Sequence, residues 1–336
     1  MADVGLGQLV TTTGRMRSRK LKDAVLDNQP VLMVMKERGG IRRVDGGRTV
    51  VEEAKTAQNS TVAWVGESGA VSLADAKVLD AAEFDWKYQL GSVSWSLAER
   101  YKNSGGSDTK FIDVVTGKFE VLEATMQNYF HEGMLSNGTG SGGLQLNGLA
   151  SLVSTTPSTG TVGGIDRSSA NAAWFRNQKF DTAADWSDGA VSAANAKRFL
   201  DKGINVTTRG SKSMIDAFIA GQTHFEFITQ AIQAIQVIQN ESETGKAGFQ
   251  KLVYRGIPIY LGGGINFSGA SAQTATRTYG LCLKPGGVNL VYHEKAEFDM
   301  LEPVQADDQA ALSRLMFTMA AMIIGGLAKF NWVGFD

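Results

Sequence analysis

The chain has 336 residues, 43% hydrophobic and 20% charged, which is typical of a folded protein and excludes a disordered one. Its 33 basic and 34 acidic residues leave a formal net charge of −1, which argues against a dedicated nucleic-acid reader and permits copies of the chain to associate. Cys282 is the only cysteine, so no disulfide framework forms within one chain.

The first residues lack the basic and then apolar pattern of a secretory signal, so we expect the chain to stay in a reducing cytoplasm. Residues 1–29 carry little apolar periodicity and place five bases and no acid between positions 14 and 22. One interpretation is a solvated arm, and the other is an arm that touches nucleic acid, a scaffold or a neighbouring subunit. The predicted arm contacts are Arg15, Arg17, Arg19, Lys20 and Lys22.

Two β segments follow the arm. Residues 49–51 lead toward residues 62–65, and residues 84–90 form the return segment, in which large apolar and polar side chains alternate with a strict period of two. The pattern predicts a long two-stranded ribbon with a loose tip at residues 66–80. Because an isolated ribbon is marginal in water, we expect another chain to cover its aromatic face. The predicted inter-subunit contacts are Trp64, Phe84, Trp86 and Tyr88.

Residues 108–135 predict one long amphipathic helix. Apolar residues recur there at spacings of three and four, at Ile112, Val115, Phe119, Leu122, Met126 and Phe130. Twenty-eight residues would span about 42 Å, far more than the average globular helix, which indicates an architectural strut.

The region from 138 to 164 is rich in Gly, Ser and Thr and marks a boundary. Beyond it we expect helices near 193–200 and 211–219, and an apolar helical stripe from Phe225 to Ile235. A strand is expected over 252–261, and Pro258 makes it an edge or bulged strand. Residues 315–328 form an apolar run too short to cross a bilayer, hence a buried strand or helix. Strands and long helices without regular alternation predict an α+β fold.

Few residues suggest chemistry. Gly138, Gly140 and Gly143 match a dinucleotide-binding string, but they follow a helix end, where a flexible joint is expected instead. His131, His224 and His293 lack metal-ligand spacing, and His131 lies where a cation would suit the helix dipole. Cys282, between two leucines, is expected in the core. We therefore predict no catalytic, cofactor-binding or metal-binding residue, no cofactor and no enzymatic activity.

The order of arm, ribbon, long helix, glycine-rich joint and mixed domain resembles the Hong Kong 97-type major capsid proteins of tailed phages. Three sets of strings carry the resemblance. Asp-Asn-Gln-Pro-Val-Leu at 27–32 with Arg-Val-Asp-Gly-Gly-Arg at 43–48 is similar to the start of the E-loop in that family. Asn-Gly-Thr-Gly at 137–140, Leu-Asn-Gly-Leu at 146–149 and Gly-Gly-Ile-Asp-Arg at 163–167 resemble the connection from spine helix to A domain. Residues 247–259 look like the edge segment of that domain.

The resemblance implies an arm at 1–29 and a spine helix at about 108–135. It implies a P domain of residues 30–144 and 291–336, with an E-loop at about 46–96, and an A domain at 145–290. It implies a structural protein of the virion, assembled in the host cytoplasm, that self-assembles into the icosahedral capsid enclosing double-stranded DNA. The expected partners are copies of itself in hexamers and pentamers, a portal protein, decoration proteins and packaged DNA contacted non-specifically, with no membrane.

Two expectations on assembly stay open. The short stretch before the ribbon implies a separate scaffolding protein or none, and lysines in the ribbon are too ordinary to predict covalent cross-linking. Another self-assembling virion protein, such as a tail-tube subunit, is the alternative, and the long helix after the ribbon favours the capsid.

Overall fold

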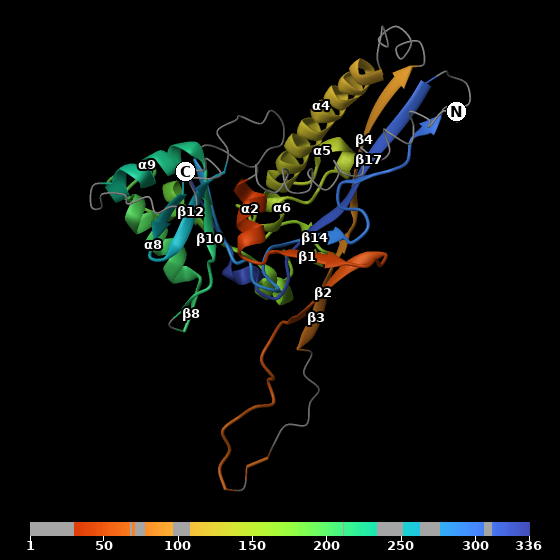
Figure 1. Ribbon diagram of the computed structural model, residues 1–336. Helices are drawn as coiled ribbons and strands as arrows, with labels where there is room; N and C mark the ends of the chain where they lie inside the picture. The colour runs from red at the N-terminus through yellow and green to blue at the C-terminus, as the bar shows by residue number, and fades with distance from the viewer. Residues whose placement is uncertain are drawn as a thin grey trace.

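The computed structural model describes residues 30–67, 69–70, 78–96, 108–210, 212–233, 251–262, 276–305 and 311–336. The predicted arm, with its five bases, lies outside these residues, as does much of the predicted ribbon tip. Two mixed sheets, each accompanied by helices, make up the body, and a long hairpin projects from it (Figure 1).

The first sheet is built around β17 (Ala311–Ile323), which pairs with four other strands. Its longest partner is β4 (Lys87–Ser96), antiparallel to it over ten residue pairs. Residues 315–323 of the predicted apolar run are therefore in a strand, and residues 324–328 lie beyond its end. None of the described helices is long and apolar enough to cross a membrane. The other strands are β1 (Ile41–Val44), β14 (Asn289–His293), β15 (Asp299–Met300) and β16 (Val304–Gln305).

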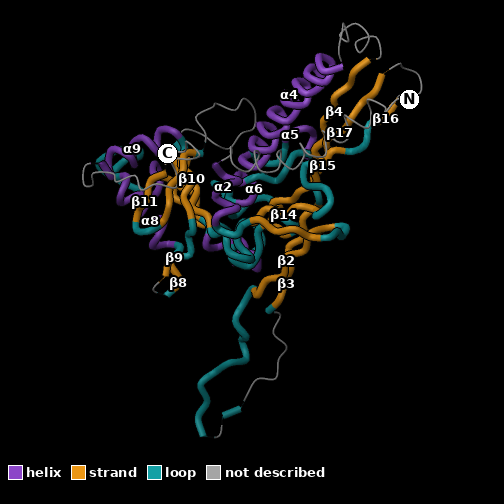
Figure 2. Tube along the Cα trace, in the orientation of Figure 1, coloured by secondary structure: helices purple, strands orange, loops and turns teal. Residues whose placement is uncertain are grey.

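Helix α4 (Asp108–Leu135) has the bounds predicted for the long helix and lies along β4 (Figures 1 and 2). Phe119, Met126 and Phe130 are buried on its apolar stripe. Gly91 of β4 lets the helix approach closely, because a Cβ atom there would lie 2.6 Å from Leu122 Cδ1. The apolar stripe predicted by the helical period therefore packs against the first sheet.

The second sheet separates two cores. Along β10 (Ala217–Ala220), Ala217 and Ile219 face the core shared with α4, while Phe218 and Ala220 face helices α8 (Ala196–Val206) and α9 (Gln222–Gln233). This period of two places one sheet between two apolar layers. In spatial order its strands are β11 (Lys251–Tyr254), β12 (Ile257–Leu261), β10, β13 (Arg277–Leu281), β18 (Trp332–Phe335) and β7 (Gln178–Asp181).

The structure changes the predicted grouping of residues 145–290 and 291–336. Strand β18 belongs to the second sheet, because Trp332 is fully buried there against Phe199 and Phe218. Conversely, Leu149 and Phe175 pack into the core shared with α4. Neither sheet is therefore made from one continuous stretch of chain.

Two expected elements of the middle region were wrong. The expected helix over 211–219 is replaced by strands β9 (Lys212–Ser213) and β10, and all four residues of β10 are buried because both of its faces are covered. The expected single strand over 252–261 is the hairpin β11–β12, which turns at Arg255 and Gly256 with positive φ angles of 49° and 78°. β11 is the edge strand, and Pro258 is tolerated in β12 because pairing with β10 begins one residue later.

Helix α8 confirms the helix expected near 193–200, although it runs from residue 196 to residue 206. Helix α9 carries the expected stripe at Phe225, Ile228 and Ile232, and Ile235 lies outside the described residues.

The other described elements are short. The helices are α2 (Pro30–Glu37), α5 (Gly140–Gly143), α6 (Leu149–Leu152), α7 (Thr182–Asp185), η1 (Ala170–Phe175) and η3 (Ala328–Phe330). The two-stranded sheets pair β2 (Thr49–Lys55) with β3 (Leu79–Asp85), β5 (Thr161–Val162) with β6 (Ile165–Asp166), and β8 (Thr208–Arg209) with β9 (Lys212–Ser213).

Candidate assembly surfaces

The projecting hairpin consists of β2 and β3, paired antiparallel from Thr49↔Asp85 to Lys55↔Leu79. The predicted ribbon was therefore wrong in its pairing. Its expected return segment is split, because residues 79–85 pair with β2 whereas residues 87–96 join β17 in the first sheet. The hairpin leaves the body and continues as a long loop (Figures 1 and 2).

The base of the hairpin is held by close glycine contacts. A Cβ atom on Gly163 would lie 2.8 Å from the Phe84 ring, and one on Gly326 would lie 3.2 Å from Ala54 Cβ. The Glu83 amide also donates a hydrogen bond of 2.9 Å to the Gly163 carbonyl. Arg42 pairs with Glu52 at 2.7 Å across the base. These contacts fix the direction in which the hairpin projects.

The loop beyond the hairpin exposes its apolar side chains. Trp64 shows 106% of its reference accessible surface, and Val62 shows 81%. Residues 62–65, expected as a strand, have no regular secondary structure. An isolated chain gains nothing from holding a tryptophan in water. Trp64 is therefore the most conspicuous apolar group that this chain leaves uncovered among its described residues.

The predicted aromatic face is only partly exposed, which corrects the expectation for two residues. Phe84 and Trp86 are 2% and 5% exposed, and both belong to the core of the subunit itself. The Trp86 Nε1–H group donates to the Gly47 carbonyl at 3.0 Å, and its ring meets His293 edge-on. The alternation predicts one continuous face, but the chain passes from one sheet to another at Trp86, so the residues before and after it have different neighbours.

Tyr88 and Leu90 lie on the face of β4 that points away from α4. They are 61% and 62% exposed, and Tyr88 stacks on Phe317 of β17 at 6.0 Å between ring centroids. The register pairs Leu90 with Phe317, so these three side chains share one apolar patch, which we call the outer patch.

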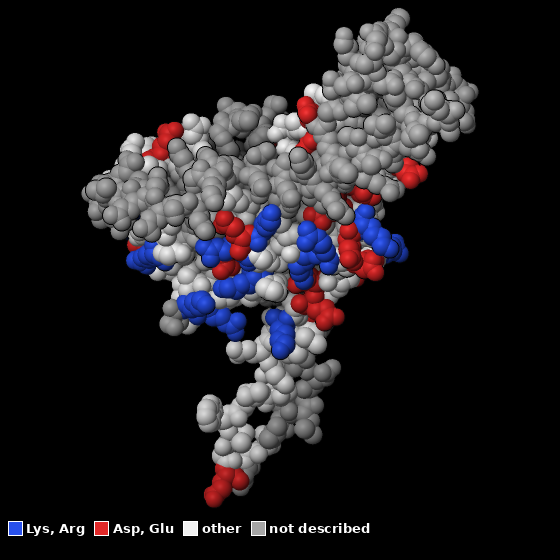
Figure 3. All heavy atoms as spheres, viewed as in Figure 1, with Lys and Arg blue, Asp and Glu red and all other residues white. Residues whose placement is uncertain are grey.

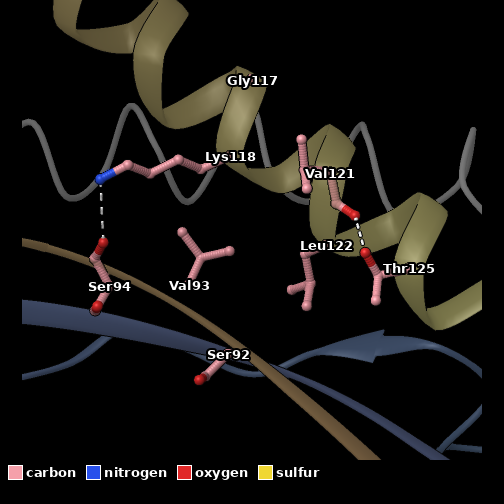
Figure 4. Close-up of a pocket in the computed structure, with 8 residues that line it drawn as sticks. All are labelled: Ser92, Val93, Ser94, Gly117, Lys118, Val121, Leu122 and Thr125. Atoms are coloured by element: carbon pink, nitrogen blue, oxygen red, sulfur yellow. Dashed lines mark hydrogen bonds between the residues drawn. The ribbon is translucent and has the colours of Figure 1, made fainter.

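A groove of about 550 Å³ lies between β4 and α4 (Figure 4). Gly117, Val121 and Thr125 line it from the helix, and Val121 is 68% exposed. The Lys118 Nζ atom lies 3.5 Å from the Ser94 carbonyl oxygen. The remaining lining residues are Ser92, Val93, Ser94, Lys118 and Leu122.

On the face shown in Figure 3, basic and acidic residues of the described chain are intermixed. Arg43 makes a two-pronged pair with the buried carboxylate of Glu297, at 2.8 and 3.0 Å, and this pairing raises the pKa of the Arg43 guanidinium. The ion pairs hold β1 and β2 to the body. The residues predicted as arm contacts lie outside the described chain.

Three titratable groups that could suggest chemistry, His131, His224 and Cys282, are buried in the core. Burial lowers the pKa of His131 to about 4, so it is neutral at physiological pH and does not act as the cation expected at the helix end. Burial also lowers the pKa of His224, which contacts Thr278 and Asp336 at 2.9 and 3.1 Å. Burial raises the pKa of the Cys282 thiol to about 11. Within the described ranges, no three potential metal ligands gather into one site.

No family model and no curated protein matches the sequence. Solved structures do match, at low identity and over nearly the whole chain. The capsid asymmetric unit of cyanophage A-1(L) is 14% identical, with 93% of each chain covered and a TM-score of 0.64. The mature capsid of bacteriophage PhiM1 is 9% identical, with 89% of this chain and 86% of that chain covered and a TM-score of 0.54. The capsid of the native GTA particle is 11% identical, with 90% and 89% covered and a TM-score of 0.53.

The chain has the capsid fold of tailed phages. The capsid fold accounts for the combination of long helix, long paired strands and projecting hairpin, and it confirms the α+β, Hong Kong 97-type expectation. Sequence reasoning missed the outer patch and the groove. The sequence of β4 contains a signal for both, because apolar Tyr88 and Leu90 are followed by serines at every second position. This pattern identifies the two surfaces only once the pairing of β4 with β17 is known.

Proposed function

We propose that this protein is the structural subunit of an icosahedral phage capsid, which self-assembles in the host cytoplasm into hexamers and pentamers and encloses double-stranded DNA. The observation that carries the proposal is Trp64, an uncovered tryptophan on a hairpin that projects from a chain with the capsid fold.

Physical chemistry supports this use of the hairpin. An uncovered tryptophan near the end of a projection contributes nothing to the fold of its own subunit, and aromatic residues dominate protein–protein contacts. A shell repeats each contact many times by symmetry, so a modest energy per contact suffices for closure. We assign Trp64 and Tyr88 to inter-subunit contacts, with the outer patch as the apolar surface available to a neighbouring copy.

The further partners follow from the same role. A closed shell that admits DNA needs a portal protein, and a separate scaffolding protein and decoration proteins fit a subunit of this kind. The arm bases Arg15, Arg17, Arg19, Lys20 and Lys22 suit non-specific contacts with packaged DNA or with a neighbour.

Assembly of the purified protein tests the proposal. Expressed alone or with a scaffold, it should form closed shells, rings of five or six, or aberrant polyheads in negative-stain micrographs. A protein that stays monomeric at high concentration by light scattering, or that forms only tubes of tail width, would contradict it.

Two tryptophan variants separate assembly from folding. Trp64→Ala should leave thermal unfolding unchanged, because the side chain is fully exposed, and should weaken or abolish shell formation. Trp86→Ala removes a buried ring and its hydrogen bond, and should destabilise the subunit itself by about 3–5 kcal/mol. Circular dichroism and sedimentation velocity distinguish the two. If Trp64→Ala still forms normal shells, Trp64 does not contribute to the contact between subunits.

A further inference from the structure

The groove between α4 and β4 exposes the backbone edge of a strand. Ser92, Val93 and Ser94 are consecutive, so their side chains point to alternate faces of the sheet. Because all three nevertheless line the groove, the groove runs along the backbone edge of the strand. The opposite edge of β4 is paired with β17, and no other described strand pairs with β4.

The hydrogen-bonding groups of this edge point into the groove. Lys118 Nζ lies 3.5 Å from the Ser94 carbonyl oxygen, which identifies the direction of the Ser94 backbone groups. In a regular antiparallel strand, alternate residues direct both backbone groups to the same edge, so those of Ser92 face the groove as well. An edge of this kind is a template for one more strand.

The helix side of the groove is a shelf for the side chains of such a strand. Gly117, Val121 and Thr125 are four residues apart and form one stripe beside the buried one. Gly117 leaves open space, and the Thr125 hydroxyl already donates to the Val121 carbonyl at 2.7 Å. The shelf therefore offers Val121 as an apolar surface and no unsatisfied side-chain donor (Figure 4).

We infer that the groove receives residues 8–13 of the same chain as an added β-strand on β4. These residues read Gln-Leu-Val-Thr-Thr-Thr between two glycines, and four of the six are β-branched, as strands prefer. No other part of residues 1–29 has such a run. The inference concerns the subunit itself and goes beyond the proposed assembly.

The length and charge of the arm suit this path. Helix α2, which starts at Pro30, packs into the same core as Met134 and Leu135 at the far end of α4. Val121 lies 14 residues from Leu135, about 21 Å along the helix, whereas the 17 residues from 13 to 30 can reach about 56 Å. The returning arm would carry five bases between positions 14 and 22 along a helix segment, residues 117–135, that holds three glutamates and one lysine.

A cysteine scan tests the inference on the isolated subunit at low concentration, so its outcome does not depend on shell formation. Ser92→Cys is combined with one cysteine at each position from 9 to 13. The native Cys282 is fully buried and does not compete. Facing residues on adjacent strands lie within disulfide reach. We expect intramolecular disulfides at alternate arm positions, seen as a mobility change of the monomer without reductant.

The matched control combines the same arm cysteines with Val253→Cys, an exposed position on the edge strand β11. Cross-linking no stronger than in this control would overturn the inference, and disulfide-linked dimers alone would show that the strand comes from another copy. As a second measurement, Val10→Pro should accelerate hydrogen exchange at the Ser92 and Ser94 amides at least tenfold while leaving α4 protected. Unchanged exchange at those amides would also overturn it.

Discussion

At the residue scale, His131 shows how burial decides the charge state of a group. It lies in the last two turns of α4 with 5% of its surface exposed, and burial lowers its pKa to about 4. Position along the helix alone favours a cation there, because the helix dipole is negative at that end. The cost of desolvating an imidazolium is larger, so the neutral ring is the one that packs.

The pKa of His131 predicts a pH dependence of stability. The folded pKa is below the unfolded value of about 6.5, so between pH 6.5 and 4 the unfolded chain binds a proton that the native chain does not. Stability from this group is present above about pH 6.5 and falls by about 3 kcal/mol by pH 4. In His131→Gln the decline in unfolding free energy over this range, measured by urea titration, should be smaller by that amount. An equal decline in both proteins would contradict the burial argument.

At the element scale, two neighbouring rows of residues on α4 differ in burial. One row packs against β4, and the adjacent row is exposed in the groove. Leu122 contacts β4 at Gly91, whereas the adjacent Val121 is 68% exposed in the groove. Leu122→Asp should force a charge into this contact and lower the unfolding free energy by about 3 kcal/mol. Val121→Asp, the same change one residue earlier, should alter it by less than about 0.5 kcal/mol. Similar losses in both variants by urea denaturation would mean that the stripe is misplaced.

Two glycines give a second matched pair, Gly148 in the loop that packs on the end of α4 and Gly117 within α4. A Cβ atom on Gly148 would lie 2.4 Å from the Gly133 carbonyl oxygen and 2.5 Å from that of Ser136, both rigid backbone atoms at the end of α4. Gly148→Ala should therefore cost about 3 kcal/mol through overpacking. Gly117→Ala faces open space within the helix and should stabilise by about 0.5–1 kcal/mol. Thermal unfolding of the two variants gives the comparison, and a tolerated Gly148→Ala would refute the close packing of the loop on α4.

At the scale of the whole molecule, the chain divides into a body that folds on its own contacts and a projection that does not contribute to them. The described residues of the loop expose their large apolar side chains, while the hairpin base is buried at Val50, Ala82 and Phe84. Removing the loop should therefore abolish assembly and leave the folding of the body unchanged.

Replacing residues 57–77 by Asn-Gly tests this separation. Thr56 and Val78 already face each other, with a 2.9 Å bond from the Thr56 amide to the Val78 carbonyl, so a two-residue turn can close the hairpin there. The melting temperature should stay within a few degrees of the parent, and closed shells should no longer form in negative-stain micrographs. Intact shells from this variant would end the assignment of the loop to assembly, and an unfolded subunit would show that the loop belongs to the body.

Elements with a strong local period were predictable from the sequence. The α4 stripe predicted the observed bounds, and residues 315–328 were expected as a buried strand or helix, of which β17 is the first. Of the four residues predicted as inter-subunit contacts, two are exposed and two are buried. Trp64 and Tyr88 are exposed as expected, whereas Phe84 and Trp86 are buried by segments distant in the sequence, including Gly163 and His293.

The sequence by itself determined which segments are amphipathic, where the long helix begins and ends, and that the chain is α+β with a net charge close to zero. Only the tertiary structure decided that residues 87–96 pair with β17 rather than with β2, that β18 joins the second sheet, and that an open strand edge borders α4. The reason is physical. A period of two or 3.6 records that the faces of an element differ, but the surface that covers each face comes from residues far along the chain, and closing those long-range contacts depends on the packing of the whole molecule.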